Sequence, residues 1–215
     1  MALTIALESH PLLELGAFVA RLPRPLAQCA TPPEIAALAR AGAELPPGLT
    51  PVDEAVKTAV RDLLRHGGFK PAGRSKPASE YLVGALADGR FPAINALVDA
   101  CNVVSLHAGL PISLVDADRT EGTLAIRCAP PGTSYVFNPS GQTIDASGLV
   151  CLYDAAGPTG TPVKDAQRTK THDDTRAAIA IVWGTRALPG RTAAATRWFR
   201  ELVAIAGATV EDVAT

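Results

Sequence analysis

The spacing of hydrophobic residues changes near Pro111, and this change limits the folds that the chain can adopt. Before Pro111 the apolar residues recur at helical spacing, most clearly in residues 50–68. After it they alternate with other residues, as in residues 122–129, before a last helical pattern over residues 192–207. Helices followed by a run of strands and a closing helix predict a mixed α+β fold, in which helices pack on a mixed or antiparallel sheet.

A single domain accounts for the whole sequence. The 215 residues, 47% of them hydrophobic, suffice for one large core, so we expect one domain over residues 1–215. The net charge of -1 argues against attraction of the whole surface to nucleic acid, and no DNA partner is expected. The sequence has neither a signal peptide nor an apolar run of transmembrane length, which predicts a soluble, cytoplasmic protein without a membrane partner.

Residues that cap helices mark where several elements begin. Thr31, Thr50, Ser79 and Thr192 are predicted helix caps, and Glu34 would complete a capping box with Thr31. The predicted helices are 31–42, 50–68, one from about Ser79, one from about Asn95, and 192–207. The predicted strands are 3–7, 15–21, 122–129, 134–137, 148–154 and 177–184.

Short polar side chains share one face of the helix that begins near Asn95. Asn95, Asp99 and Asn102 follow i, i+4, i+7 spacing. An exposed helix face usually carries long charged residues instead. This face is therefore expected to form hydrogen bonds with something fixed, which is either a neighbouring loop or a ligand.

The densest polar stretch is the segment QRTKTHDDTR, residues 167–176, between two predicted strands. It is either a solvated turn or one wall of a binding site. Asp116 and Asp118 lie two residues apart and are more simply explained as turn residues that cap backbone amides. Arg74, with Lys70 and Lys76, is a candidate phosphate contact in a polar loop.

Recognisable metal and nucleotide motifs are absent. The four cysteines and four histidines have no metal-ligand spacing, so neither a metal nor another cofactor is expected. The glycine-rich phosphate-binding fingerprints and the serine-hydrolase elbow are missing as well.

Residues 95–137 resemble the B3/B4 domain of the bacterial phenylalanyl-tRNA synthetase beta subunit. The resemblance is carried by NALVDACNVVSLHAGLPISLVDADRTEGTLAIRCAPPGTSYVF, with N-x-x-V-D-x-x-N, then G-x-P, then D-x-D, then a strand that contains an arginine. The flanking segments 69–86 and 164–175 resemble freestanding relatives of that domain, and the likeness is strongest over residues 60–185.

The resemblance implies a metal-free hydrolase. In the synthetase the domain removes misattached tyrosine from the phenylalanine tRNA, as water attacks the aminoacyl ester. The present sequence departs from the family at two positions. Ser113 stands where the family has a histidine, and Gln167 stands near the family's pocket glutamate. The identity of the amino acid that is removed therefore does not carry over.

These observations predict a hydrolase that deacylates a mischarged aminoacyl-tRNA at its 3′ end. Thr169, Thr171 and Asn102 are the predicted catalytic residues. The predicted substrate contacts are Arg168, Lys170, Gln167, Asn95, Asp99, Asp116, Ser113 and Arg74. The alternative is a non-catalytic module that binds an amino acid, a nucleotide or a tRNA end. The site requires the 95–102 face and the 167–172 loop to lie near each other.

Overall fold

The strands of the computed structural model form one curved sheet and a small hairpin. The structure describes residues 3–215. The strands are β1 (Leu3–Leu7), β2 (Leu13–Arg21), β3 (Ile112–Asp116), β4 (Leu124–Cys128), β5 (Ser134–Val136), β6 (Thr143–Asp145), β7 (Val150–Asp154), β8 (Gly157–Gly160), β9 (Ala177–Thr185) and β10 (Thr209–Ala214). Eight of them pair in the order β3-β9-β2-β10-β1-β4-β7-β8, and β5 pairs with β6. Only the β1 pairings with β10 and β4 are parallel, so the predicted mixed sheet is confirmed.

The two outer strands of this sheet approach each other. The Ser113 hydroxyl on β3 donates to the carbonyl of Thr161, just after β8 (3.1 Å). Gly160 makes this approach close, because a Cβ at that position would lie 3.1 Å from the Ser113 Cβ. The sheet therefore curls towards a barrel, and its two edges meet beside the segment that follows β8.

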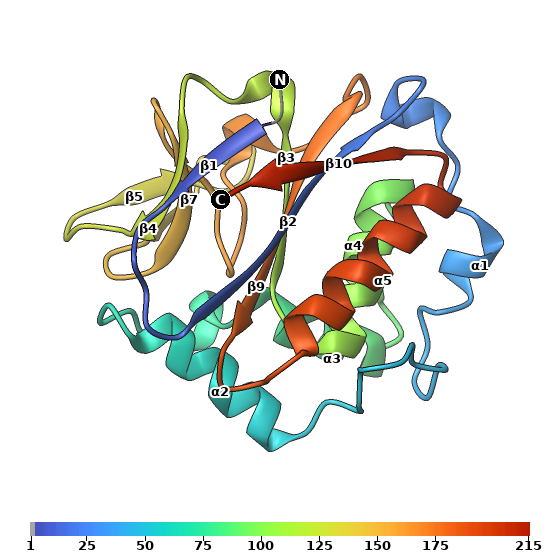
Figure 1. The fold of residues 1–215 in the computed structure, drawn as a ribbon, viewed down its shortest axis with the longest axis horizontal. Helices are drawn as coiled ribbons and strands as arrows, with labels where there is room; N and C mark the ends of the chain where they lie inside the picture. The colour runs from blue at the N-terminus through green and yellow to red at the C-terminus, as the bar shows by residue number, and fades with distance from the viewer. Residues whose placement is uncertain (1–2) are drawn as a thin grey trace.

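The helices cover one face of the sheet and its lower end. They are α1 (Pro33–Ala36), α2 (Glu54–Arg65), α3 (Ala78–Ala87), α4 (Ala96–Ala108) and α5 (Arg191–Ile205). Figure 1 shows α4 and α5 side by side against the sheet, with α2 and α3 below them, and α5 contacts β2, β9 and β10. All nine residues of β9 are buried, because this strand pairs with β3 on one side and β2 on the other and also contacts α2 and α5.

The first predicted helix is mostly wrong. Residues 31–42 contain a four-residue helix, Pro33–Ala36, followed by turns. Thr31 does not cap it, since its hydroxyl donates to the Asp99 carboxylate (2.6 Å). Without that cap or a capping box, four residues gain too few hydrogen bonds to extend the helix.

Three further predicted caps are wrong for a related reason. The helices begin after Asp53, Pro77 and Gly190 instead. Ser79 and Thr192 lie inside helices, and their hydroxyls donate to the Gly109 carbonyl (3.0 Å) and the Glu14 carboxylate (2.6 Å). Thr50 accepts from Arg191 (3.1 Å). In each case the hydroxyl that local spacing assigned to a helix end forms a hydrogen bond with a distant segment instead.

The described residues include no helix long and apolar enough to cross a membrane.

Candidate functional site

The polar stretch found in the sequence lies in the loop between β8 and β9, residues 161–176, which we call the β8–β9 loop. Its middle forms a short 3-10 helix, Gln167–Thr169. It runs past the place where β3 and β8 meet, and Lys170 forms a β-bridge with Val115 of β3. The loop is therefore part of the seam that closes the sheet, and its conformation is fixed from several sides.

Arg168 holds the loop to β7. Its guanidinium donates to both oxygens of Asp154 (2.8 and 2.6 Å) and to the carbonyls of Gly157 and Pro158. Burial raises the pKa of Asp154, but the hydrogen bonds, led by that from Arg168, outweigh burial and leave this pKa below its ordinary value. Asp154 is therefore a buried carboxylate whose charge is matched by Arg168. This pairing leaves Arg168 little freedom to contact the phosphates for which the sequence predicted it.

Thr169 and Lys170 face the protein as well. Thr169 is fully buried, and its hydroxyl is 3.4 Å from the carbonyls of Thr159 and Ala166. The Lys170 ammonium donates to the Phe137 carbonyl just after β5. Burial lowers the pKa of Lys170, and the neighbouring Lys164 lowers it further, whereas Asp165 acts against them. Of the two, only Lys170 is partly exposed to solvent.

The second half of the loop is held by β3. Asp116 is buried, and it accepts hydrogen bonds from the Thr175 hydroxyl and from the backbone N–H of Asp118 (2.9 Å). His172 lies 3.2 Å from the same carboxylate. The turn interpretation of Asp116 is therefore confirmed: it orders this part of the loop.

A carboxylate that the sequence did not single out lies at the centre of the seam. Asp165 accepts from the backbone N–H groups of Leu114 (3.0 Å) and Thr161 (3.1 Å), and thus joins β3 to the loop. Burial raises the pKa of Asp165, although the Ser113 hydroxyl, the two N–H groups and Lys170 act against burial. Asp165 was missed because nothing in the local pattern distinguishes it from the solvated acids nearby.

The polar face of α4 makes contacts with fixed parts of the protein. Asn95 is the N-cap and accepts from Val98 N–H (3.0 Å). Asp99 is buried, and it accepts from Thr31 and from the Ile94 N–H (2.7 Å). The neighbouring-loop interpretation therefore holds for Asp99, through Thr31, whereas Asn95 caps its own helix. Asn102 is partly exposed, and its side chain forms no hydrogen bond with any residue in the 3–215 range.

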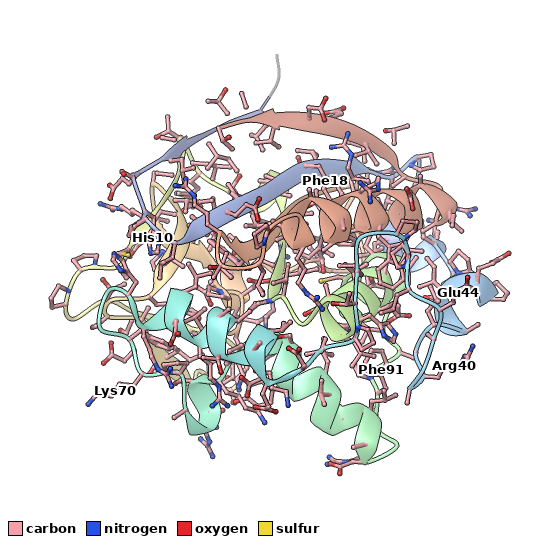
Figure 2. All side chains as sticks on the ribbon, turned by 60° about the horizontal axis from the view of Figure 1, so that its bottom comes forward. His10, Phe18, Arg40, Glu44, Lys70 and Phe91 are labelled. Atoms are coloured by element: carbon pink, nitrogen blue, oxygen red, sulfur yellow. The ribbon has the colours of Figure 1, made fainter. Side chains whose placement is uncertain are left out.

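The opposite sides of α4 face different surroundings. Asp99 lines a cavity of about 280 Å³ together with α1 and residues 89–93, which no residue of the β8–β9 loop lines. Phe91 and Arg40 are on this side of the molecule in Figure 2. Burial and the nearby Asp165 carboxylate raise the pKa of the Cys101 thiol, so α4 approaches the loop at Cys101.

The remaining predicted residues differ in exposure. Ser113 is fully buried, and besides its bond to Thr161 it accepts from the Trp183 indole N–H (2.8 Å). Arg74 is exposed, whereas Gln167 and Thr171 are partly exposed. None of these last three side chains has a hydrogen bond to another part of the described chain. The side chains best placed to meet a ligand are therefore Arg74, Gln167, Thr171 and Asn102.

A family model matches more than half of the chain. The family model described as the B3/4 domain matches residues 71–203, which include α4 and the entire β8–β9 loop. The phenylalanine–tRNA ligase beta subunit of Cutibacterium acnes is 29% identical over 80 residues, 37% of this chain and 10% of that protein. The beta subunit from Bartonella henselae is 26% identical over 98 residues, 44% of this chain and 12% of that protein. The chain thus spans about a tenth of the length of these relatives.

A solved structure has a similar fold. It is an N-terminal fragment of the phenylalanyl-tRNA synthetase beta-subunit from Pyrococcus horikoshii. The two align with a TM-score of 0.55 at 9% sequence identity, over 98% of this chain and 51% of that one. At this identity the likeness concerns the fold alone.

Proposed function

Because this chain belongs to the B3/4 domain family, we propose that it hydrolyses the ester bond of a mischarged aminoacyl-tRNA. The family match, which includes the β8–β9 loop and α4, is the observation that carries this proposal. The curated relatives are subunits of a tRNA ligase, and such enzymes handle the same ester bond. The substrate of this chain would be a tRNA to which a synthetase has attached the wrong amino acid.

Water is the nucleophile in the proposed reaction. It attacks the carbonyl carbon of the ester, the bond to the tRNA ribose oxygen breaks, and the proton that water loses passes to that oxygen. Hydrolysis of an activated ester can rely on positioning and on donors that stabilise the oxyanion. Thr171 and Asn102 retain free polar groups for the water or the ester. The Lys170 ammonium next to Thr171 adds positive charge where the oxyanion would form.

Other residues of the proposed site act at a distance from the reacting atoms. Arg168 and Thr169 hold the loop, through Asp154 and through the carbonyls of Thr159 and Ala166. In the proposal they position Lys170 and Thr171. Gln167 is partly exposed on the same loop, and in the proposal it contacts the amino-acid side chain of the substrate. An amide donates as well as accepts, so this residue suits a polar side chain.

A deacylation assay over a panel of mischarged tRNAs tests the proposal. Purified protein is expected to release the amino acid from at least one of them faster than buffer does. Thr171→Val should reduce that rate, whereas Arg40→Ala, which changes an exposed arginine in the turns after α1, should not. Release at the buffer rate from every tRNA in the panel would refute the hydrolase proposal.

One observation favours a non-catalytic binding module as the second candidate. Arg168, a predicted substrate contact, and Thr169, a predicted catalytic residue, are both occupied by contacts within the protein. A module of this kind would bind a charged tRNA end and leave the ester intact. Binding of a mischarged tRNA with an unchanged ester half-life would favour this candidate.

A further inference from the structure

Aromatic rings and lysines alternate along a row beside the β8–β9 loop. The Lys76 ammonium lies 4.5 Å from the centre of the Tyr81 ring. The Lys164 ammonium lies 5.3 Å from the same ring and 4.2 Å from the Phe137 ring. The row thus runs Lys76, Tyr81, Lys164, Phe137, with partly exposed residues throughout. We call it the Lys76–Phe137 row.

Three separate segments build this row, and hydrogen bonds hold them in register. Ala78 N–H, at the start of α3, donates to the Pro162 carbonyl in the loop (2.9 Å). The buried Tyr135 hydroxyl of β5 donates to the Lys164 carbonyl (2.6 Å). Lys170 donates to the Phe137 carbonyl, which joins the hairpin to the loop. These hydrogen bonds therefore fix the relative positions of the three segments that carry the row.

The positive charge of the row has no acidic partner in the protein. Neither Lys76 nor Lys164 forms an ion pair within residues 3–215, and the same holds for the adjacent Arg74. The nearest acid on α3, Glu80, accepts both of its hydrogen bonds from Arg61 (2.7 Å each).

Crowding of like charges is visible in the lysines themselves. Burial lowers the pKa of Lys164, and the Arg74 charge lowers it further. Lys164 in turn lowers the pKa of Lys170. An anion placed among these groups would relieve their repulsion.

We propose that the Lys76–Phe137 row binds the single-stranded end of an RNA. Lys76, Lys164 and Arg74 would contact successive phosphates, and the rings of Tyr81 and Phe137 would stack on bases. Aromatic rings between cations are the usual means by which proteins hold single strands, because every base has a stackable face. Lysine side chains are flexible, so an arriving base displaces an ammonium from a ring onto a neighbouring phosphate. This surface rests on the proposed function, since it would deliver a tRNA 3′ end to Lys170 and Thr171.

Binding of a short uncharged RNA tests the row without requiring catalysis. The probe is a fluorescent ACCA tetraribonucleotide, titrated with the purified chain. The double variant Lys76→Gln/Lys164→Gln should weaken binding at least ten-fold and flatten its salt dependence, because each phosphate that is no longer neutralised lowers the slope by about 0.7. Tyr81→Ala should weaken binding about ten-fold, since a stacked base contributes that order of affinity. Tyr81→Phe should retain affinity, because the ring remains.

Arg40→Gln is the control for charge. Arg40 is exposed, forms no ion pair within residues 3–215 and contacts no ring of the row, and it lies across the molecule from Lys70 in Figure 2. The Arg40→Gln variant loses one positive charge away from the row and should bind like the wild type. Thermal unfolding of each variant identifies any loss of binding that comes from misfolding.

The outcomes separate this inference from the hydrolase proposal. Equal loss of affinity in Arg40→Gln and in the row variants would overturn the row, and so would binding of inorganic polyphosphate as tightly as ACCA. Row-dependent ACCA binding without deacylation of any tRNA would keep the row and refute the hydrolase. Deacylation with an unchanged KM in the row variants would keep the hydrolase and refute the row.

Discussion

The Arg168 guanidinium donates two hydrogen bonds, of 2.8 and 2.6 Å, to the carboxylate of Asp154, and the Asp154 side chain is fully buried. This pair connects the β8–β9 loop to β7, at the seam where the sheet closes on itself. Removal of one partner of such a pair leaves the other charge buried without compensation, which is costly. The pair therefore makes the loop, and with it the proposed site, part of the folded core.

Arg168→Ala is expected to destabilise the protein by about 2–3 kcal/mol. This is less than the 3–5 kcal/mol typical of fully buried pairs, because a third of the Arg168 side chain is exposed. Urea unfolding at neutral pH measures the effect. Arg119→Ala, at an exposed arginine without an ion pair in the described chain, should change stability by less than about 0.5 kcal/mol.

The same pair predicts a dependence on acid. The pKa of Asp154 is lower in the folded chain than in the unfolded chain. Its contribution to stability is therefore complete above the ordinary pKa, about 4, and is lost as the pH falls below that value. Unfolding curves between pH 5 and pH 3 should show a smaller loss in Arg168→Ala than in the wild type. Parallel loss in both proteins would contradict the pairing.

His10 predicts a second pH effect, at a higher pH. In the turn between β1 and β2 its Nδ1 accepts from the N–H groups of Leu12 (3.3 Å) and Leu13 (3.1 Å), so the ring is neutral with its proton on Nε2. Burial, with the charges of His66 and Arg186, lowers the pKa of His10. The unfolded chain takes up the proton first, so stability should fall as the pH drops below about 6.5.

His10→Asn isolates that effect. A short amide can still accept from nearby backbone N–H groups in a turn, but it cannot titrate. The difference in unfolding free energy between pH 7.5 and pH 5.5 should shrink in this variant. An unchanged difference would show that another group causes it.

The contact between Thr31 and Asp99 predicts that this part of α4 is structural. Thr31→Val removes the hydroxyl that donates to the buried carboxylate and should cost about 1–3 kcal/mol of stability. Deacylation per folded molecule should be unchanged, because Asp99 and the β8–β9 loop line no common cavity among those found in residues 3–215. A lower kcat in fully folded Thr31→Val would show that Asp99 contributes to the site.

The sequence predicted most of the elements that depend on local patterns. The alternation in 177–184 corresponds to β9, Ala177–Thr185, and the helical spacing in 50–68 corresponds to α2, Glu54–Arg65. Strand β10, Thr209–Ala214, was not predicted, because it carries the adjacent acids Glu211 and Asp212 and depends on pairing with β1 and β2, which are distant in sequence. Local spacing is enough where a periodic face is buried, but not where pairing depends on distant strands.

The site was less predictable than the fold for the same physical reason. The density of polar residues in the sequence pointed to residues 167–176, and this segment does lie at the seam. Its partners, however, come from β3, β5 and β7, so the sequence could not separate Arg168, which is paired, from Thr171, which is not. Asp165 and the Lys76–Phe137 row depend entirely on such long-range contacts, and neither was found from spacing.

Two neighbouring threonines provide the sharpest comparison in the loop. Thr169→Val and Thr171→Val are the same chemical change, two residues apart, in contrasting surroundings. The Thr169 hydroxyl is buried between the carbonyls of Thr159 and Ala166, so its loss should lower stability by about 1–2 kcal/mol. Thr171 is partly exposed and has no hydrogen bond from its side chain to other described residues, so its loss should leave stability within about 0.5 kcal/mol of the wild type.

The kinetic effects of the two threonine variants should be reversed. If Thr171 orients the water or the ester, Thr171→Val should lower kcat for deacylation about ten-fold or more, with little change in KM. Thr171→Ser keeps the hydroxyl and should restore most of that rate. Thr169→Val, assayed below its unfolding temperature, should lower kcat less than Thr171→Val does, since its hydroxyl holds the loop and does not reach the substrate. A full rate in Thr171→Val together with a large loss in Thr169→Val would reverse the assignment and place the chemistry at the buried hydroxyl, which requires the loop to open during turnover.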